Sequence, residues 1–278
     1  MIEEVRRLAK KWLESRKVDA IVGLRENNGY VAPYLFTETG ELERLVISSH
    51  TSDIIPRYSM FSKSQRYKKN ILYLLEKKYP KAKIGVVARG CDEKTLIELA
   101  KRDQLDLEKI AILAVACTKE DAIDCRCPTP YPTRIDVGER VEGVSSDMNV
   151  EALLKKNLEE RFSFWKHELS KCIKCYGCRN VCPSCFCEDC KMEQDLWAQM
   201  GQLPPEIPMF HLIRWYHVAD RCIECGECEQ TCPVDIPLLT IFKLLRKDIK
   251  DMFDYEAGSD AKQESPLLTT LDETPLKE

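Results

Sequence analysis

The sequence lacks the features that define several common classes of protein. It contains no apolar run approaching the roughly 18 residues of a membrane-spanning helix, and residues 1–20 lack the apolar core of a signal peptide. With 42 basic and 46 acidic residues, the net charge of −4 gives no electrostatic argument for nucleic acid or an anionic membrane as partner. We therefore expect a cytoplasmic protein that neither inserts into a membrane nor binds nucleic acid.

Glycine and recognisable catalytic motifs are also scarce. Only 11 of the 278 residues are glycine and no G-x-G-x-x-G motif is present, so a Rossmann dinucleotide site is not supported. The acidic, basic and nucleophilic residues show no spacing that is typical of a catalytic site, and we predict no catalytic residue. Cysteine, in contrast, is abundant, with 15 residues, which in a reducing compartment indicates metal chemistry.

Eight cysteines form two copies of the run C-x2-C-x2-C-x3-C-P, which is the ligand pattern of bacterial-type ferredoxins. In two-cluster ferredoxins the fourth cysteine, followed by proline, ligates the other cluster. We therefore predict two [4Fe-4S] clusters with crossed ligation. Cluster A has the ligands Cys172, Cys175, Cys178 and Cys232, and cluster B has the ligands Cys222, Cys225, Cys228 and Cys182.

Other uses of these eight cysteines fit less well. A zinc site usually takes four ligands from two CxxC pairs, whereas here a run of four cysteines occurs twice and each copy ends in Cys-Pro. Disulfides require an oxidising compartment, to which nothing in the sequence points. A purely structural iron–sulfur protein is a further alternative, although two adjacent clusters normally form an electron path.

Seven cysteines lie outside the two motifs, and four of them predict a third metal centre. Cys125 and Cys127 belong to a loop stiffened by three prolines within five residues. Our predicted ligand set combines them with Cys187 and Cys190, with Cys185 as an alternative ligand. Buried free thiols and a zinc site of the same sulfurs remain alternative interpretations.

The first half of the chain predicts alternating strands and helices. Apolar stretches at 18–24, 82–88 and 110–116 are typical of strands, and helices are expected over 3–17, 67–79 and 93–102. A hairpin is expected from 34–37 and 42–48. Strand, turn, helix and strand in succession favour an α/β fold.

We predict four regions: an α/β domain over 1–148, a connecting helix over 149–170, a ferredoxin-like domain over 171–250 and an acidic tail over 251–278. The ferredoxin-like domain is expected to be α+β, with an insertion between the two cluster motifs. The tail holds little core material, so we expect it to be disordered or to dock on a partner.

One turn of the α/β domain is a candidate ligand site. Arg89, Gly90, Cys91 and Asp92 follow a predicted strand and begin a predicted helix, which is where α/β folds tend to bind ligands. The alternative is a plain tight turn with a buried thiol at Cys91.

The double ferredoxin run, the turn at 89–92 and the Cys125-x-Cys127 loop resemble the beta-subunit family of deazaflavin-coenzyme hydrogenases and dehydrogenases. Members accompany hydrogenases, formate dehydrogenases and heterodisulfide-reductase-type complexes. The resemblance covers most of residues 80–245 and implies an α/β domain that often binds FAD beside an iron–sulfur cluster. It implies that residues 89–92 lie near the flavin and that the C-x-C loop lies near the extra cluster. The first half, about 150 residues long, is shorter than the family pattern.

Two functions follow from these observations. The first is an electron-transfer subunit of a multisubunit anaerobic oxidoreductase, which relays single electrons between a partner's redox centre and another carrier. The second is a flavin-containing subunit that exchanges a hydride with a soluble deazaflavin or nicotinamide coenzyme and passes the electrons to its clusters. Both predict other redox subunits as partners, and neither the donor nor the acceptor follows from the sequence.

Overall fold

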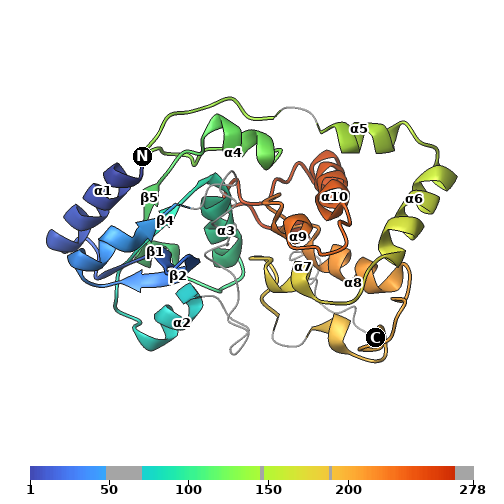
Figure 1. Cartoon of the computed structure of the whole chain (residues 1–278), viewed down its shortest axis with the longest axis horizontal. Coiled ribbons are helices and arrows are strands. Elements are labelled where there is room, and N and C mark those ends of the chain that lie inside the picture. The colour runs from blue at the N-terminus through green and yellow to red at the C-terminus, as the bar shows by residue number, and fades with distance from the viewer. Residues whose placement is uncertain (48–70, 145–146, 188–189, 267–278) are drawn as a thin grey trace, which may run out of the picture.

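The computed structural model describes residues 1–47, 71–144, 147–187 and 190–266. The sheet lies in the first half of the chain, and helices and loops around the two cysteine motifs form the second half (Figure 1). No helix within the described ranges is long and apolar enough to cross a bilayer.

The sheet has five strands, β1 (Ala20–Asn27), β2 (Tyr30–Phe36), β3 (Leu45–Val46), β4 (Ile84–Ala88) and β5 (Ile110–Ala114). Strands β1, β4 and β5 run parallel in that order, whereas β2 and β3 pair antiparallel with β1. Parallel neighbours need crossover connections, and the segments containing helices α2 (Ile71–Lys78) and α3 (Gly90–Ala100) supply them. The first half is therefore an α/β domain, as the sequence predicted.

Helices cover both faces of this sheet. Helix α1 (Ile2–Glu14) buries Val5, Ala9 and Trp12, because residues three or four apart share one helix face. Consecutive residues of β1, Ile21 and Val22, belong to two different apolar clusters, since side chains alternate across a strand. The cluster with α1 contains Ile21, and the cluster with Leu72 of α2 and Leu96 of α3 contains Val22.

The hairpin expected from 34–37 and 42–48 is wrong in the part that the structure describes. The turn at Asn28 and Gly29 joins β1 to β2 instead, and both residues have positive φ, as a two-residue hairpin turn requires. Residues Thr39–Arg44 form a 3-10 helix, η1, stabilised by reciprocal hydrogen bonds between Glu38 and Glu41. This local capping box outweighs the alternating pattern on which the hairpin prediction rested.

The second half is helical rather than α+β. It contains α5 (Met148–Leu154), α6 (Leu158–Ser170), α7 (Gly177–Asn180), α8 (Met209–Val218), α9 (Glu227–Gln230) and α10 (Leu238–Phe253), and the described residues from 147 to 266 form no strand. The shorter elements η2 (Leu107–Lys109), α4 (Lys119–Asp124) and η3 (Lys191–Glu193) complete the order. The expected connecting helix over 149–170 is two helices, because Asn157 caps α6 through a bond from the Glu160 amide.

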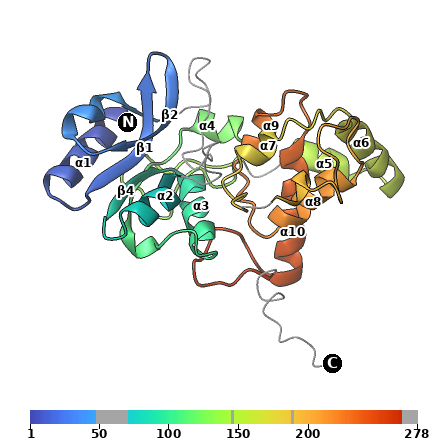
Figure 2. The same cartoon turned by 90° about the horizontal axis from the view of Figure 1, so that it is seen from below.

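The described part of the predicted tail packs on the chain itself. We call residues 254–266 the strap; it turns back from α10 toward α3 (Figure 2). Tyr255 is 1% exposed and Ser265 is fully buried, so this segment is neither a disordered tail nor a free docking arm. Its apolar contacts are one small cluster of Tyr255 and Ala257 with Ile249, and polar groups hold the rest, so the sequence showed little core material there.

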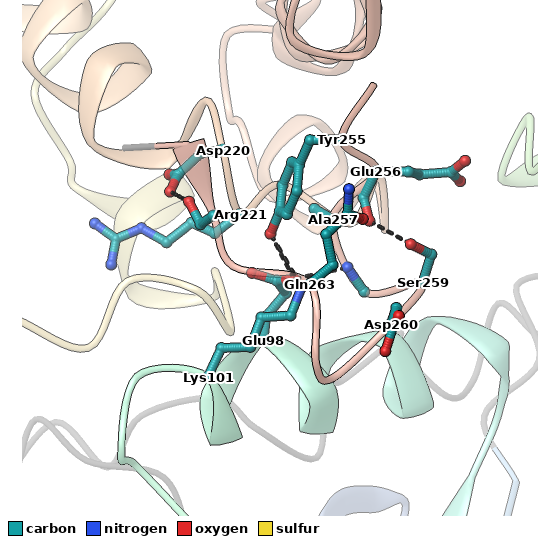
Figure 3. Close-up of polar contacts among 12 residues, drawn as sticks. Glu98, Lys101, Asp220, Arg221, Tyr255, Glu256, Ala257, Ser259, Asp260 and Gln263 are labelled. Carbon is teal, nitrogen blue, oxygen red and sulfur yellow. Dashed lines mark hydrogen bonds and ion pairs between the residues drawn. The ribbon is translucent and has the colours of Figure 1, made fainter. Parts of the chain in front are cut away.

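The strap is fastened by what we call the Glu98 network, which joins both halves of the protein. Glu98 on α3 accepts hydrogen bonds from the Tyr255 hydroxyl at 3.1 Å and the Gly258 amide at 2.7 Å (Figure 3). Arg102, one turn later, pairs with Glu98 and, at 2.8 Å, with Asp220. The Ser265 hydroxyl donates to the same Asp220 carboxylate. These carboxylates are buried with compensating partners, which is the condition under which buried charge is tolerated.

Candidate iron–sulfur centres

The two cysteine motifs repeat one backbone conformation. Lys174 and Glu224, two residues after the first cysteine of each motif, have φ of 51° and 56°. Tyr176 and Gly226, one residue after the second cysteine, have φ of 58° and 77°. Non-glycine residues adopt this left-handed region at a cost, and such strain tends to occur at functional sites. The matching turns curl each C-x2-C-x2-C run around one point.

These turns aim backbone amides at sulfur atoms. The Lys174 amide donates to the Cys172 sulfur and the Gly177 amide donates to the Cys175 sulfur, both at 3.4 Å. In the second motif the Glu224 amide donates a hydrogen bond to the Cys222 sulfur, and this bond acts to lower the pKa of that thiol. Hydrogen bonds to sulfur are one of the means by which a protein adjusts an iron–sulfur cluster.

Four of the motif cysteines line one cavity in the second half. Its lining contains all four predicted cluster B cysteines, namely Cys182, Cys222, Cys225 and Cys228. Its volume is about 330 Å³, part of it open to solvent, and apolar side chains such as Val218, Leu239 and Phe242 form much of the wall. Cys182 comes from the first motif and the other three come from the second, so the fold brings together residues forty positions apart.

The cysteines predicted for cluster A are also neighbours. Burial and, to a smaller degree, the nearby thiols of Cys178, Cys175 and Cys232 together raise the pKa of Cys172 to about 11. Cys175 is exposed, whereas the other three are partly buried. Cys232, from the second motif, is therefore the counterpart of Cys182 in the first.

Burial makes these thiols reluctant to ionise without a metal. It raises the pKa of Cys222 to about 11 and that of Cys228 to about 12, because an isolated thiolate is poorly solvated there. A thiol must lose its proton to bind iron, and the iron ions of a cluster would supply the positive charge that stabilises the buried thiolates. Arg214 lines the same cavity, and its Nε and Nη1 have no hydrogen-bond partner among the described residues. Buried donors that face sulfur ligands fit an anionic cluster.

A second, larger cavity lies at the carboxyl ends of strands β4 and β5. Its volume is about 500 Å³, including space open to solvent, and four thiols from the first half line it. These are Cys91, Cys117, Cys125 and Cys127. Cys91 is at the start of α3 and Cys117 follows β5, so the parallel pairing of the two strands brings them together. Burial raises the pKa of Cys117 strongly, and the nearby Cys91 raises it further.

Two glycines allow the Cys125-x-Cys127 loop to close over this cavity. A side chain at Gly90 would meet the Tyr131 carbonyl oxygen at 2.5 Å, and one at Gly143 would meet the Pro128 carbonyl oxygen at 2.0 Å. Only residues without a Cβ permit such close backbone approach. Arg126, between the two cysteines, pairs with Asp147 and with Glu229 of α9, which ties the loop to the second half.

The structure divides the predicted third ligand set. Cys125 and Cys127 line the larger cavity, but the lining does not include Cys185, Cys187 or Cys190. Cys190 packs with Met192 and Phe210 in a separate apolar cluster, and Cys187 is exposed. Cys185 is instead a hydrogen-bonding neighbour of Cys182. The cavity that Cys125 and Cys127 line also contains Cys91 and Cys117, which the predicted ligand set did not include.

The turn at residues 89–92 forms the end wall of both this cavity and a third one. Arg89 is buried and pairs with Asp92, whose carboxylate also accepts the Arg89 amide at 2.9 Å. The third cavity, of about 300 Å³, is otherwise lined by apolar residues, Leu24, Val46, Ile47, Val87 and Val115. Arg89 and Asp92, the two charged residues of this lining, neutralise each other, so the lining offers no free positive charge for a pyrophosphate. It therefore does not by itself support the FAD that the resemblance implied.

No three or more His, Cys, Asp or Glu side chains in the described ranges lie close enough together to hold a single metal ion. The thiols instead gather in two groups, each of which lines a cavity. Several soft thiolate donors around one space suit a polynuclear iron–sulfur group.

Comparison with known proteins identifies the class of the second half. Residues 168–236 match the family described as "4Fe-4S dicluster domain". The second half is therefore an iron–sulfur domain of the ferredoxin type.

Two relatives match a longer part of the chain than residues 168–236. The chain is 40% identical over 134 residues to the F420-dependent formate dehydrogenase subunit beta of Methanocaldococcus jannaschii, covering 47% of this chain and 35% of that protein. It is 34% identical over 179 residues to the F420-dependent formate dehydrogenase 1 subunit beta of Methanococcus maripaludis, covering 63% of this chain and 44% of that protein. The chain thus spans less than half the length of these relatives. Their similarity confirms the resemblance to the beta-subunit family of deazaflavin-coenzyme hydrogenases and dehydrogenases.

Proposed function

We propose that this protein is an iron–sulfur electron-transfer subunit of an oxidoreductase complex. One observation carries the proposal: Ile223 and Cys225 line both thiol cavities, so a single wall separates the larger cavity from that of cluster B. Two centres on either side of one shared wall form a path rather than two isolated structural sites. Bound clusters supply one-electron chemistry at each point of this path.

The ligand assignment follows from the cavities and the thiol neighbours. Cys182, Cys222, Cys225 and Cys228 hold cluster B, and Cys172, Cys175, Cys178 and Cys232 hold cluster A. Cys91, Cys117, Cys125 and Cys127 hold a third cluster, centre C, in the α/β domain. Cys225 remains a ligand of cluster B and separates it from centre C. The order of the path is then centre C, cluster B and cluster A.

We expect Cys182→Ala to damage cluster B more than cluster A. Cys182 lines the cavity of the second motif although it belongs to the first, so its loss removes one of four ligands there. Spectra that resolve the two clusters in anaerobic protein provide the measurement. The matched variant Cys232→Ala should show the opposite preference, and selective loss of cluster A from Cys182→Ala would overturn the crossed assignment.

The outer end of the path lies beside an apolar surface. Several large apolar side chains between residues 196 and 216 are exposed, among them Leu196, Trp197, Met200, Leu203 and Tyr216. On α8, Met209 and Tyr216 are exposed whereas Phe210 and Trp215 are buried, so only part of this helix is available to a partner. Phe210 belongs to the apolar cluster that also contacts Cys172, a cluster A ligand.

We propose that another redox subunit covers this surface, which we call the 196–216 patch. Exposed aromatic and methionine side chains are enriched where proteins associate. The relatives are named as subunits of F420-dependent formate dehydrogenases, which supports a partner in an oxidoreductase complex of that kind.

Anaerobic isolation from the native source tests the subunit assignment. We expect a species larger than the 32.1 kDa chain, stable to added salt because the contact is mainly apolar. Tyr216→Glu should weaken it, and Leu158→Glu, which places the same charge on an exposed leucine of α6, should not. A lone chain that passes electrons at full rate between a soluble coenzyme and a soluble acceptor would overturn this proposal.

The absorbance of the same sample separates the two proposed functions. A flavin band above the broad iron–sulfur absorption would favour hydride exchange with a soluble deazaflavin or nicotinamide coenzyme. Its absence would favour the pure relay.

A further inference from the structure

Arg214 lies on α8 between the cysteines of the two motifs, with 5% of its surface exposed. Its Nη2 donates to the carbonyl oxygen of Cys178 at 3.1 Å, and its guanidinium lies 4.8 Å from the centre of the Phe242 ring. These two contacts fix the guanidinium plane at the cavity of cluster B, which Arg214 lines. Its Nε and Nη1 are fully buried and have no partner within the described residues.

The charge on Arg214 also differs from that of the other buried arginines. Arg89, Arg102 and Arg246 each pair with at least one carboxylate. No carboxylate lies within ion-pair distance of Arg214 in the part of the chain that the structure describes. A buried charge is costly without a compensating one, so the pocket must supply negative charge by other means.

The groups that surround Arg214 identify that negative charge. Its electrostatic neighbours are the thiols of Cys178, Cys182, Cys185 and Cys228. Cys178 belongs to the proposed ligand set of cluster A, and Cys182 and Cys228 belong to that of cluster B. His211, three residues earlier on the same helix, is neutral at ordinary pH, because burial, and to a smaller degree Arg214, lower its pKa to about 4. Guanidinium itself stays protonated throughout the accessible pH range.

We propose that Arg214 raises the reduction potentials of clusters A and B by donating hydrogen bonds to their sulfur atoms and by placing an uncompensated positive charge between them. This inference rests on the proposed function, in which the two cysteine motifs hold clusters A and B. Reduction adds one electron, and hence one negative charge, to a cluster, and a fixed cation favours the more negative state. Net charge and hydrogen bonds to sulfur are recognised determinants of cluster potential. No proton transfer is involved, since Arg214 stays charged in both states.

The test compares reduction potentials in anaerobic full-length protein titrated with dithionite and followed by electron paramagnetic resonance. Arg214→Met removes the charge and all donors while keeping an unbranched apolar side chain. At a fixed solution potential, we expect at least a tenfold lower ratio of reduced to oxidised cluster, equivalent to about 59 mV for one electron. Both clusters should shift in the same direction.

Arg221→Gln is the matched control. Arg221 adjoins the ligand Cys222, but it is partly exposed and its guanidinium lies over the Phe186 ring. Salt screens exposed charges more than buried ones, so its effect should be small and should vanish at high ionic strength. The effect of Arg214→Met should persist at high ionic strength.

Iron content keeps the outcomes separate. Fewer than about eight iron atoms in the unaltered protein would contradict the two-cluster proposal itself. With full iron content, unchanged potentials in Arg214→Met would overturn the role of Arg214. If Arg214→Met fails to hold iron, Arg214→Lys is titrated instead. Because lysine keeps the positive charge, the reduction potentials should fall less in Arg214→Lys than is expected for an uncharged residue. Loss of iron from both variants would assign Arg214 to cluster assembly and overturn the tuning role.

Discussion

Replacing Cys91 by alanine should remove one third of the iron from the anaerobic protein. Three cubane clusters hold about twelve iron atoms, and the variant should hold about eight because centre C loses one of four ligands. Clusters A and B should keep their spectra, since none of their proposed ligands is altered. Iron analysis together with electron paramagnetic resonance of the reduced protein provides the measurement.

The control for Cys91→Ala is Cys187→Ala. Cys187 was predicted from the sequence as a ligand of the third centre, but it is exposed and does not line the cavity. We expect its replacement to leave iron content unchanged. If Cys187→Ala loses about four iron atoms and Cys91→Ala loses none, the ligand set predicted from the sequence is right and centre C as placed here is wrong.

The second large effect concerns the strap. Glu98→Gln removes the carboxylate that compensates Lys101 and one of the two that pair with Arg102, while leaving a side chain of nearly the same shape. Removing one partner of a buried ion pair costs about 3–5 kcal/mol, because the remaining charge stays buried. We expect a loss of this size in the free energy of unfolding and a strap that becomes sensitive to protease.

Urea unfolding and limited proteolysis under anaerobic conditions measure both consequences. Glu264→Gln is the control, since Glu264 lies in the same strap but is exposed. Surface substitutions of this kind usually change stability by less than about 0.5 kcal/mol. Equal unfolding midpoints for the two variants would show that the Glu98 network does not hold the strap.

The sequence predicted the class of the first half and the residue types of the iron–sulfur sites. Parallel strands and their helices were recognisable because their apolar residues follow the periods of strands and helices. The cysteine spacing was recognisable because ligands to one cluster must lie close together along the chain. Both are local signals.

What the sequence did not reveal depends on contacts between distant residues. Cys91 and Cys117 meet only because β4 and β5 are parallel neighbours, so that the positions after the two strands lie at one edge of the sheet. The predicted strands contained this information, and a rule that joins the carboxyl ends of parallel strands would have found the pair. No such rule was available for Glu98 and Tyr255, which are 157 residues apart and lie in contact through a single hydrogen bond between their side chains.

The strap also has a mechanical consequence. The chain passes from the sheet to the helical half and then returns to α3, so the two halves are joined at both ends, by the segment around Arg126 and by the Glu98 network. Two joints oppose the hinge motion that a single linker would permit. The separation between the two thiol cavities, which share the wall at Cys225, then stays constant. Because electron tunnelling weakens steeply with distance, a path of constant length operates as a fixed conductor, and its rate is set by driving force rather than by the opening and closing of domains.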